Sequence, residues 1–207
     1  MRMRVGTLIG AGVPLAWAAA MLLARFVDPW IPIALAALLV SAAIVSAGRP
    51  DVRALFRPAR STILIGLLGA AIMLAATYGL FPLVAGRVPA VALETRNLYA
   101  TFLTGRRTVS ILLFVIPVIV AEELMWRGAF QEWVAQRLPG SRLAIIVLAA
   151  AGYAIAHLPL GSPLLAGIAF LCGLYWSALR SLTRTVVPSL IAHLAWDLAL
   201  ILVPLNR

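Results

Sequence analysis

The segment Val109-Ser-Ile-Leu-Leu-Phe-Val-Ile-Pro-Val-Ile-Val-Ala-Glu-Glu-Leu-Met-Trp-Arg-Gly128 decides the fold, because it sets three charged side chains into an apolar run. Glu122, Glu123 and Arg127 lie at membrane depth if this run crosses a bilayer. An ionisable residue at that depth costs roughly 2.5 to 3.5 kcal/mol on insertion scales, so a function is its default explanation. Both histidines of the chain also lie in apolar segments.

Composition sets the class of protein. Of the 207 residues, 63% are hydrophobic and 12% are charged, whereas soluble domains carry about 25% charged residues. The net charge of +10 comes from 17 arginines without any lysine. These arginines lie mainly between apolar runs, where they contact lipid headgroups and set topology. A polytopic membrane protein is therefore predicted, and we expect no nucleic-acid partner.

Seven apolar segments approach the length of about 20 residues that a helix needs to cross a bilayer core. The first follows Met-Arg-Met-Arg and is too long for a typical signal peptide, so we interpret it as a retained helix. The predicted spans are Val5–Ala24, Trp30–Gly48, Ser61–Val84, Val109–Val134, Leu143–His157, Pro163–Leu179 and Thr185–Val203. The predicted fold is an all-α membrane helix bundle with about seven transmembrane helices.

The stretch from Arg87 to Arg107 mixes charged and aromatic residues, which fits an interfacial amphipathic segment or a loop. No internal repeat, low-complexity tract or linker divides the chain, so a single integral-membrane domain is predicted over residues 1–207. Cys172 lies in an apolar run and has no second cysteine to pair with, so it does not indicate a redox compartment.

The arginines orient the predicted bundle. Most of them gather on one side if the N-terminus shares that side with the loops 49–60, 137–142 and 180–184, and we expect this side to be cytoplasmic. Arg207 then lies on the other side. If residues 87–107 re-enter or span the membrane, the later helices cross it in the opposite direction. The expected location is an inner (plasma) membrane with a cytoplasmic N-terminus.

Helical periodicity assigns the charged side chains of the fourth span to faces. Glu123 and Arg127 stand four residues apart with the acid nearer the N-terminus, an arrangement that favours an ion pair. Glu122 points about 100° away from Glu123 on a helix of 3.6 residues per turn, so it is free to face a cavity.

Two further polar pairs share helix faces. His193 and Asp197 stand four residues apart, and His157 follows Tyr153 at the same spacing. A carboxylate and an imidazole can hold a water molecule and remove its proton, and a second imidazole can stabilise an oxyanion. We therefore predict that these side chains converge with Glu122 in a site that adds water to an amide.

Each residue also has a plainer interpretation. For Glu123 and Arg127 a structural ion pair is favoured over direct chemistry. A histidine inside a membrane can form a helix-to-helix hydrogen bond instead of catalysing a reaction. For Tyr153, packing in the core is the first expectation.

The polar residues of the C-terminal half form three short motifs. In chain order they are Glu122-Glu123-Leu-Met-Trp-Arg127, Tyr153-x-x-x-His157 and His193-x-x-x-Asp197. The series resembles the CPBP family, which comprises the CAAX-prenyl-protease-type and bacteriocin-processing (Abi) intramembrane endopeptidases. Residues 109–200 carry the resemblance and form the expected catalytic half, whereas the first three spans show only generic hydrophobicity.

The resemblance implies catalytic roles for four residues. Glu122 and His157 would activate the attacking water. His193 and Asp197 would line the site and stabilise the oxyanion.

The resemblance also implies that Glu123 and Arg127 support the architecture of the site. Family members commonly have Phe where this chain has Tyr153, which would form an aromatic wall of the substrate pocket. They often have Asn where this chain has Asp197. Because a carboxylate donates no hydrogen bond unless it is protonated, we expect Asp197 to orient His193 or to hold it as an imidazolium.

Two histidines and a carboxylate could also bind zinc, so Glu122, His157 and His193 form an alternative metal set. The family has been labelled as metalloproteases. The fourth span, however, lacks the His-Glu-x-x-His motif that puts two ligands one turn apart. We expect no cofactor, with zinc as the alternative.

The main hypothesis is an intramembrane endopeptidase that cuts a membrane-associated or lipid-modified peptide or protein. A proton-coupled transporter is the first alternative, because buried acids and histidines form proton relays. No inverted repeat or pair of interrupted helices supports it. A noncatalytic immunity or scaffold protein is the second. The chain resembles a prokaryotic member, and the cytoplasmic side is the first choice for substrate access.

Overall fold

The structure is a computed structural model that describes residues 2–47 and 51–205, with side chains from residue 9 onward in the first range. These residues form helices and no strand. The helices are α1 (Arg2–Leu23), α2 (Trp30–Ser46), α3 (Val52–Leu55), α4 (Arg60–Arg87), α5 (Pro89–Leu103), α6 (Thr108–Glu122), η1 (Glu123–Phe130), α7 (Gln131–Arg137), α8 (Arg142–His157), η2 (Leu158–Leu160), α9 (Pro163–Thr183) and α10 (Val187–Leu202). The all-α prediction is confirmed.

Four helical stretches are long and apolar enough to cross a membrane: Arg60–Arg87, Thr108–Arg137, Arg142–Leu160 and Pro163–Thr183. Three shorter apolar helices accompany them: Ile9–Leu23, Trp30–Ser46 and Val187–Leu202. Each of the seven predicted spans coincides with one of these seven helices. Gly48, at the predicted end of the second span, lies outside the described residues, as do Arg49 and Arg207.

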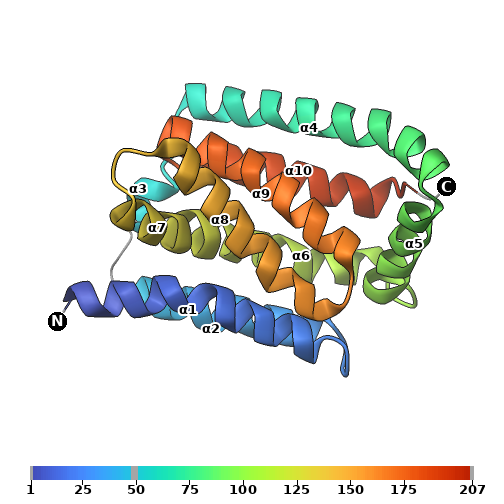
Figure 1. Ribbon diagram of the computed structural model, residues 1–207, viewed down its shortest axis with the longest axis horizontal. Coiled ribbons are helices and arrows are strands. Elements are labelled where there is room, and N and C mark those ends of the chain that lie inside the picture. Colours follow the sequence, from blue (N-terminus) through green and yellow to red (C-terminus); the bar gives the residue numbers. More distant parts are fainter. Residues whose placement is uncertain (1, 48–50, 206–207) are drawn as a thin grey trace.

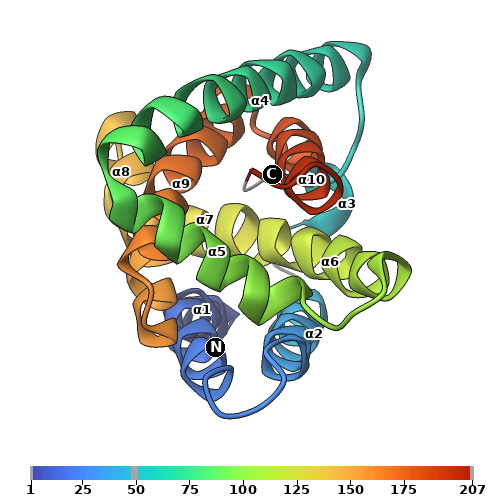
Figure 2. The same cartoon turned by 90° about the vertical axis from the view of Figure 1, so that its right-hand side faces the viewer.

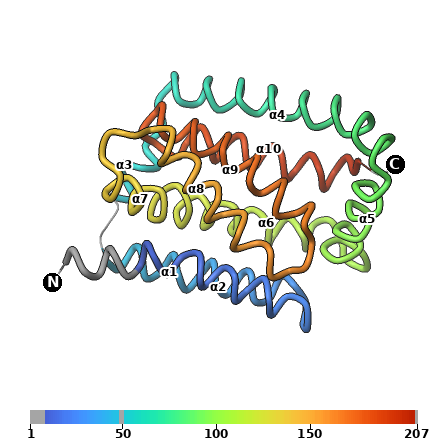
Figure 3. The backbone as a smooth tube through the Cα atoms, viewed as in Figure 1, coloured from blue at the N-terminus to red at the C-terminus, as the bar shows by residue number. Residues whose placement is uncertain are grey.

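The long helices run back and forth along one axis (Figures 1 and 3). Viewed from the end, the helix formed by α6, η1 and α7 lies between α1 and α2 on one side and α10 and α4 on the other (Figure 2). α8 packs against α9, and α10 packs against both α4 and α9. The central helix is thus enclosed by neighbours, and polar residues on it can be buried.

Apolar side chains cover much of the outer surface. Leu35, Leu38 and Leu39 on α2 and Leu64 and Leu68 on α4 are each more than half exposed. A soluble monomer rarely exposes such large apolar surfaces, whereas a bilayer covers them. The protein is an integral membrane helix bundle.

The stretch between Arg87 and Arg107 forms a helix rather than a loop. α5 crosses one end of the bundle, and α6 starts at the end where α4 stops (Figure 1). The loops that contain residues 51–59, 138–141 and 184–186 lie together at the opposite end. Arg53, Arg57, Arg137, Arg142 and Arg184 lie in or beside these connections, so they share one side, as the sequence predicted.

Candidate active site

The central helix changes its hydrogen-bond pattern at the candidate site. Residues Glu123–Phe130 form a π-helix, in which the N–H of Gln131 reaches back to the carbonyl of Trp126, and all eight are buried. The sequence predicted an uninterrupted α-helix here, so the π-helical turn is a correction. Such turns insert residues into a helix and are frequent at functional sites. Here Glu122 faces α8 and Glu123 faces α10.

Glu122 is buried and receives a hydrogen bond from the neighbouring helix. The hydroxyl of Tyr153 donates to Oε2 of Glu122 over 2.6 Å. Within the described part of the chain, no hydrogen bond involves the other oxygen, Oε1. Because Glu122 lines a cavity, Oε1 is available to a water molecule.

His157 is held at both ring nitrogens. It is the last residue of α8, and its Nδ1 lies 2.7 Å from the carbonyl oxygen of Tyr153. The indole N–H of Trp17 donates to Nε2 of His157 over 3.1 Å. A carbonyl only accepts and an indole only donates, so the ring carries its proton on Nδ1 and is neutral. The lone pair that could receive a proton from water is therefore bonded to Trp17 in this arrangement.

Glu123 is hydrogen-bonded to two buried groups and forms an ion pair with a third. Its Oε2 receives the hydroxyl of Ser189 at 2.5 Å, and its Oε1 lies 2.9 Å from Nδ1 of His193 and 3.4 Å from a nitrogen of Arg127. The ion pair expected between Glu123 and Arg127 is confirmed. The sequence did not predict the shorter contact with His193, which joins the central helix to α10.

Arg127 is buried between aromatic rings. Its guanidinium carbon lies 4.8 Å from the ring centre of Tyr153 and 4.9 Å from that of Trp176. Its contact with Glu123 is its only ion pair among the described residues. Cation–π contacts of this kind gain strength when they are desolvated. Arg127 thus compensates the charge of Glu123 and contacts the ring of Tyr153, which is consistent with a supporting role.

His193 stacks on Trp176, with ring centres 3.7 Å apart. Its Nε2 lies 3.7 Å from Oδ2 of Asp197, which is an ion-pair distance but too long for a hydrogen bond. The shared face expected for His193 and Asp197 is confirmed. The Asp197 side chain is 28% exposed, so it is the more accessible member of the pair.

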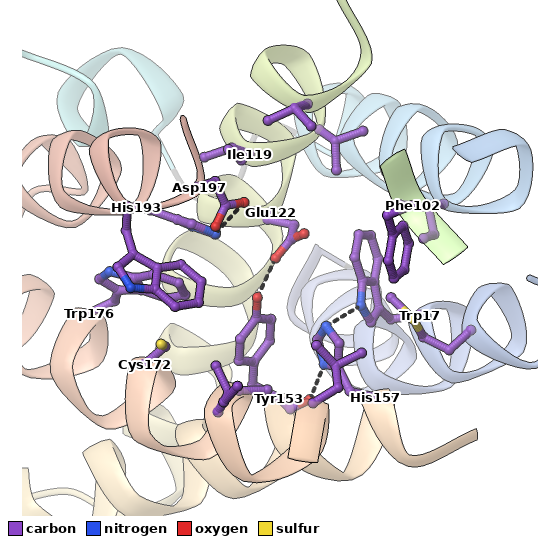
Figure 4. A pocket seen from close by; sticks show the side chains of 18 of the residues that line it. Trp17, Phe102, Ile119, Glu122, Tyr153, His157, Cys172, Trp176, His193 and Asp197 are labelled. Atoms are coloured by element: carbon purple, nitrogen blue, oxygen red, sulfur yellow. Dashed lines mark hydrogen bonds and ion pairs between the residues drawn. The ribbon is translucent and has the colours of Figure 1, made fainter. Parts of the chain in front are cut away.

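A polar cavity of about 200 Å³ joins these groups (Figure 4). Its walls include Glu122, Tyr153, His157, His193 and Asp197. At about 30 Å³ per molecule it has room for several waters. The four predicted catalytic residues, which come from three helices, therefore line one shared cavity. Glu123 and Arg127 do not line it.

A larger apolar cavity of about 620 Å³ adjoins the polar one, between α4, α5, α9 and α10. Asp197, Trp196 and Cys172 line both spaces. Most of the other lining residues are aliphatic or aromatic. Asp197 thus lies where the apolar space meets the polar one.

The polar cavity lies toward the end of the bundle that α5 crosses. Two contacts fix the end of α5 there: the indole N–H of Trp30 donates to the carbonyl of Phe102 over 3.0 Å, and Arg106 pairs with Asp28 at 2.7 Å. The hydrogen bond from Arg106 holds the pKa of Asp28 below its usual value. Both Trp30 and Phe102 line the cavity, so these contacts fix part of its wall at that end.

The alternative metal set does not have the geometry of a metal site. Among the residues that the structure describes, no three His, Cys, Asp or Glu side chains are grouped so that they could hold a metal ion. Both nitrogens of His157 are engaged by Trp17 and Tyr153. Nδ1 of His193 is engaged by Glu123. The donors as arranged do not fit zinc.

Sequence reasoning missed Ser189 and Trp17, which contact residues of the site. Ser189 precedes His193 by four residues, so the spacing rule that paired His193 with Asp197 would have found it. Trp17 lies in the middle of an apolar run with no polar neighbour in sequence. Only the packing of α1 against α8 reveals its contact with His157.

Residues 103–199 match the family model described as type II CAAX prenyl endopeptidase Rce1-like. This segment, just under half of the chain, is similar to the CAAX-type intramembrane endopeptidases of the CPBP family. The resemblance drawn from the three motifs is thereby confirmed. Searches of the curated proteins and of the solved structures found no match. The matched segment contains the four residues predicted to be catalytic but excludes α1 and Trp17.

Proposed function

We propose that this CAAX-type endopeptidase hydrolyses a peptide bond of a membrane-associated or lipid-modified substrate with a water activated by Glu122 and His157. One observation carries the proposal: side chains from three helices line a single buried, polar cavity. A buried acid that keeps one oxygen unbonded beside room for water is suited to general-base chemistry. We propose residues 109–200 as the catalytic half of one domain.

In the proposed reaction, Oε1 of Glu122 accepts a proton from water as the water oxygen bonds to the carbonyl carbon. The tetrahedral intermediate then breaks its C–N bond, and the proton on Glu122 passes to the leaving amine. His157 holds the same water through Nε2 once that nitrogen exchanges the indole of Trp17 for water. The water thus supplies the new C–O bond and the proton of the amine, and no added cofactor is needed.

The oxyanion requires hydrogen-bond donors on the opposite side of the cavity. His193 gives its Nδ1–H to Glu123, so a donor toward the cavity must be Nε2–H. Protonation of both nitrogens is favoured by Glu123 on one side and Asp197 on the other. We therefore assign oxyanion stabilisation to His193 and assign to Asp197 the role of keeping it charged. Glu123 and Arg127 hold His193 in place.

The adjoining apolar cavity supports a substrate with an apolar segment or lipid group next to the scissile bond. At about 620 Å³ it is of the size that binds small ligands. Because Asp197 lines both cavities, an apolar group in the larger one would place neighbouring peptide atoms near the polar residues.

We propose an inner (plasma) membrane location of a prokaryotic type with a cytoplasmic N-terminus, from the arginines that gather at one end of the bundle. The polar cavity lies toward the other end, near α5. This orientation would give the substrate access from the non-cytoplasmic side, in place of the cytoplasmic side expected from sequence. Labelling of single cysteines in loops at each end would test the orientation.

We also propose that no metal takes part. Loss of cleavage on adding a chelator, with recovery by zinc alone, would reverse this part of the proposal.

The function is tested by comparing the termini of membrane peptides in cells that express wild-type protein, Glu122→Gln or Glu132→Gln. Glu132 is a matched control because it lies on the same continuous helix with a 45% exposed side chain, outside both cavities. We expect at least one new terminus with the wild-type and Glu132→Gln proteins and none with Glu122→Gln. Identical termini in all three would refute the proposal. Proton-coupled transport that depends on Glu122 would then favour the transporter.

A further inference from the structure

Tyr153 forms hydrogen bonds with both groups proposed to activate water. Its hydroxyl donates to Glu122 over 2.6 Å, and its carbonyl oxygen accepts from Nδ1 of His157 over 2.7 Å. The side chain is 5% exposed and lines the polar cavity. Figure 4 shows the hydroxyl directed at the carboxylate, with His157 one turn along the same helix. The sequence had suggested only an aromatic wall here.

The hydrogen bond decides which oxygen of Glu122 remains available. A carboxylate on a rotatable side chain can present either oxygen to the cavity. The hydroxyl of Tyr153 occupies Oε2, so Oε1 is the atom left to bind water. The ring that carries the hydroxyl is itself fixed by Arg127 on one face and by Trp126, 5.0 Å away between ring centres. The hydroxyl is therefore a rigid donor rather than a mobile one.

The bond to the carbonyl of Tyr153 fixes the second group. Because Nδ1 of His157 must carry its proton to donate there, Nε2 is the nitrogen that remains basic. Nε2 is the nitrogen that Trp17 contacts, beside the cavity. Tyr153 thus determines which atom of each group is left to accept a proton. Its side chain leaves Oε1 of Glu122, and its backbone carbonyl leaves Nε2 of His157.

We propose that the Tyr153 hydroxyl is a positioning group for the reaction, which orients Glu122 so that Oε1 meets the water. This inference rests on the proposed function of Glu122. A packing role alone requires only the ring, which phenylalanine supplies equally well. Tyr153→Phe keeps the ring that packs against Arg127 and Trp126, so the fold should accept it.

The test uses full-length protein in lipid vesicles and a synthetic peptide that spans the terminus produced only when Glu122 is intact. Tyr153→Phe should lower kcat by about tenfold or more with KM changed by less than about twofold, since a hydrogen bond to a charged group is lost in the reacting state. Tyr78→Phe is the matched control. It removes a hydroxyl that bonds the carbonyls of Ala199 and Val203, outside both cavities, and should leave kcat unchanged.

Thermal unfolding distinguishes a loss of activity from a loss of folded protein. Thermal unfolding of Tyr153→Phe should stay cooperative, and its stability should couple to Glu122→Gln in a double-mutant cycle because the two side chains are bonded. Full kcat in Tyr153→Phe, with Glu122→Ala inactive, overturns the inference and leaves the proposed function standing. Full activity in Glu122→Ala overturns the proposed function and this inference with it. Equal losses in kcat for Tyr153→Phe and Tyr78→Phe would also overturn the inference, because the effect would not be specific to Glu122.

Discussion

The two halves of the chain use buried polar groups differently. Before Leu103, the buried polar side chains among the described residues are Thr62 and Thr95, and both are uncharged. After it, the buried set includes two glutamates, an arginine and both histidines. Among the described residues, the buried side chains of the N-terminal half are therefore uncharged, and the C-terminal half carries the buried charges. Several hydrogen bonds join the halves, and the one from the indole of Trp17 reaches His157.

The segment 103–199 that matches the family model contains the proposed catalytic residues but only part of the cavity wall. α1 contacts α8, α7 and η1, and α2 contacts α6 and η1. Trp17, Met21 and Ile33 form part of the cavity wall. Without these three side chains the polar groups would face lipid, and exposure of charged groups to the bilayer interior is energetically costly.

The largest expected effect comes from removing an acid in the charged half. Glu123→Ala leaves Arg127 and His193 buried without their shared carboxylate, and breaking such a pair costs about 3 to 5 kcal/mol. Unfolding in detergent, followed by tryptophan fluorescence, measures the loss. Glu132→Ala is the control, because its carboxylate is 45% exposed and lies 3.7 Å from Arg180. A cost for Glu123→Ala no greater than for Glu132→Ala would contradict the difference between buried and exposed acids.

The positions of the apolar helices and the pairs at four-residue spacing could be predicted from the sequence. Hydropathy alone located α8 up to His157, and spacing paired Glu123 with Arg127. The π-helical turn could not be predicted, because it depends on neighbours on several sides that periodicity does not describe. The bond from Trp17 to His157 joins residues 140 positions apart. No local pattern in α1 marks it.

The docking of α1 on the charged half gives the second prediction. A Cβ on Gly10 would lie 2.5 Å from Cβ of Trp133, whereas nothing lies within 4 Å of one on Gly12. Gly10→Ala should lower the free energy of unfolding by about 1 to 3 kcal/mol through overpacking. Gly12→Ala should be neutral or slightly stabilising, since alanine favours the helix. Equal unfolding midpoints for the two variants would show that α1 does not dock closely at Gly10.

The third prediction concerns the hydrogen bond by which the N-terminal half contacts His157. Trp17→Phe keeps a ring but removes the N–H that occupies Nε2 of His157, the nitrogen that the proposed reaction needs for water, so kcat should rise by an amount equivalent to about 0.5 to 1.5 kcal/mol. Trp126→Phe is matched, because the N–H of Trp126 is buried and bonds to nothing in the described residues. Cleavage rates of the peptide in vesicles measure both. A rate for Trp17→Phe below that of wild type would contradict the proposal that Nε2 of His157 releases Trp17 before it holds water.

The smallest effect is expected at the exposed contact between Asp28 and Arg106, which joins α1 and α2 to the start of α6. Asp28→Asn keeps the oxygen that accepts from the N–H of Trp30 but removes the charge. An exposed pair is worth about 0.2 to 1 kcal/mol and weakens with salt. Asp28→Asn should lower the free energy of unfolding by this amount at neutral pH and low salt.

The pH dependence of this pair has a defined sign. Because the bond to Arg106 lowers the pKa of Asp28 in the folded protein, the stabilisation is present above the unfolded pKa of about 4 and is lost as the pH falls through the folded pKa. A double-mutant cycle with Arg106→Gln isolates the pair. A coupling that persists at 1 M salt or rises at acid pH would contradict this assignment.

The central claim is tested most directly by cleavage in a purified system. Wild type, Glu122→Ala and His157→Ala are reconstituted in lipid vesicles with a peptide that spans the terminus found in cells. We predict that all three proteins unfold cooperatively and that only the wild type cuts the peptide. Full cleavage by a folded Glu122→Ala or His157→Ala protein would contradict the claim that these two side chains act on one water in the buried cavity.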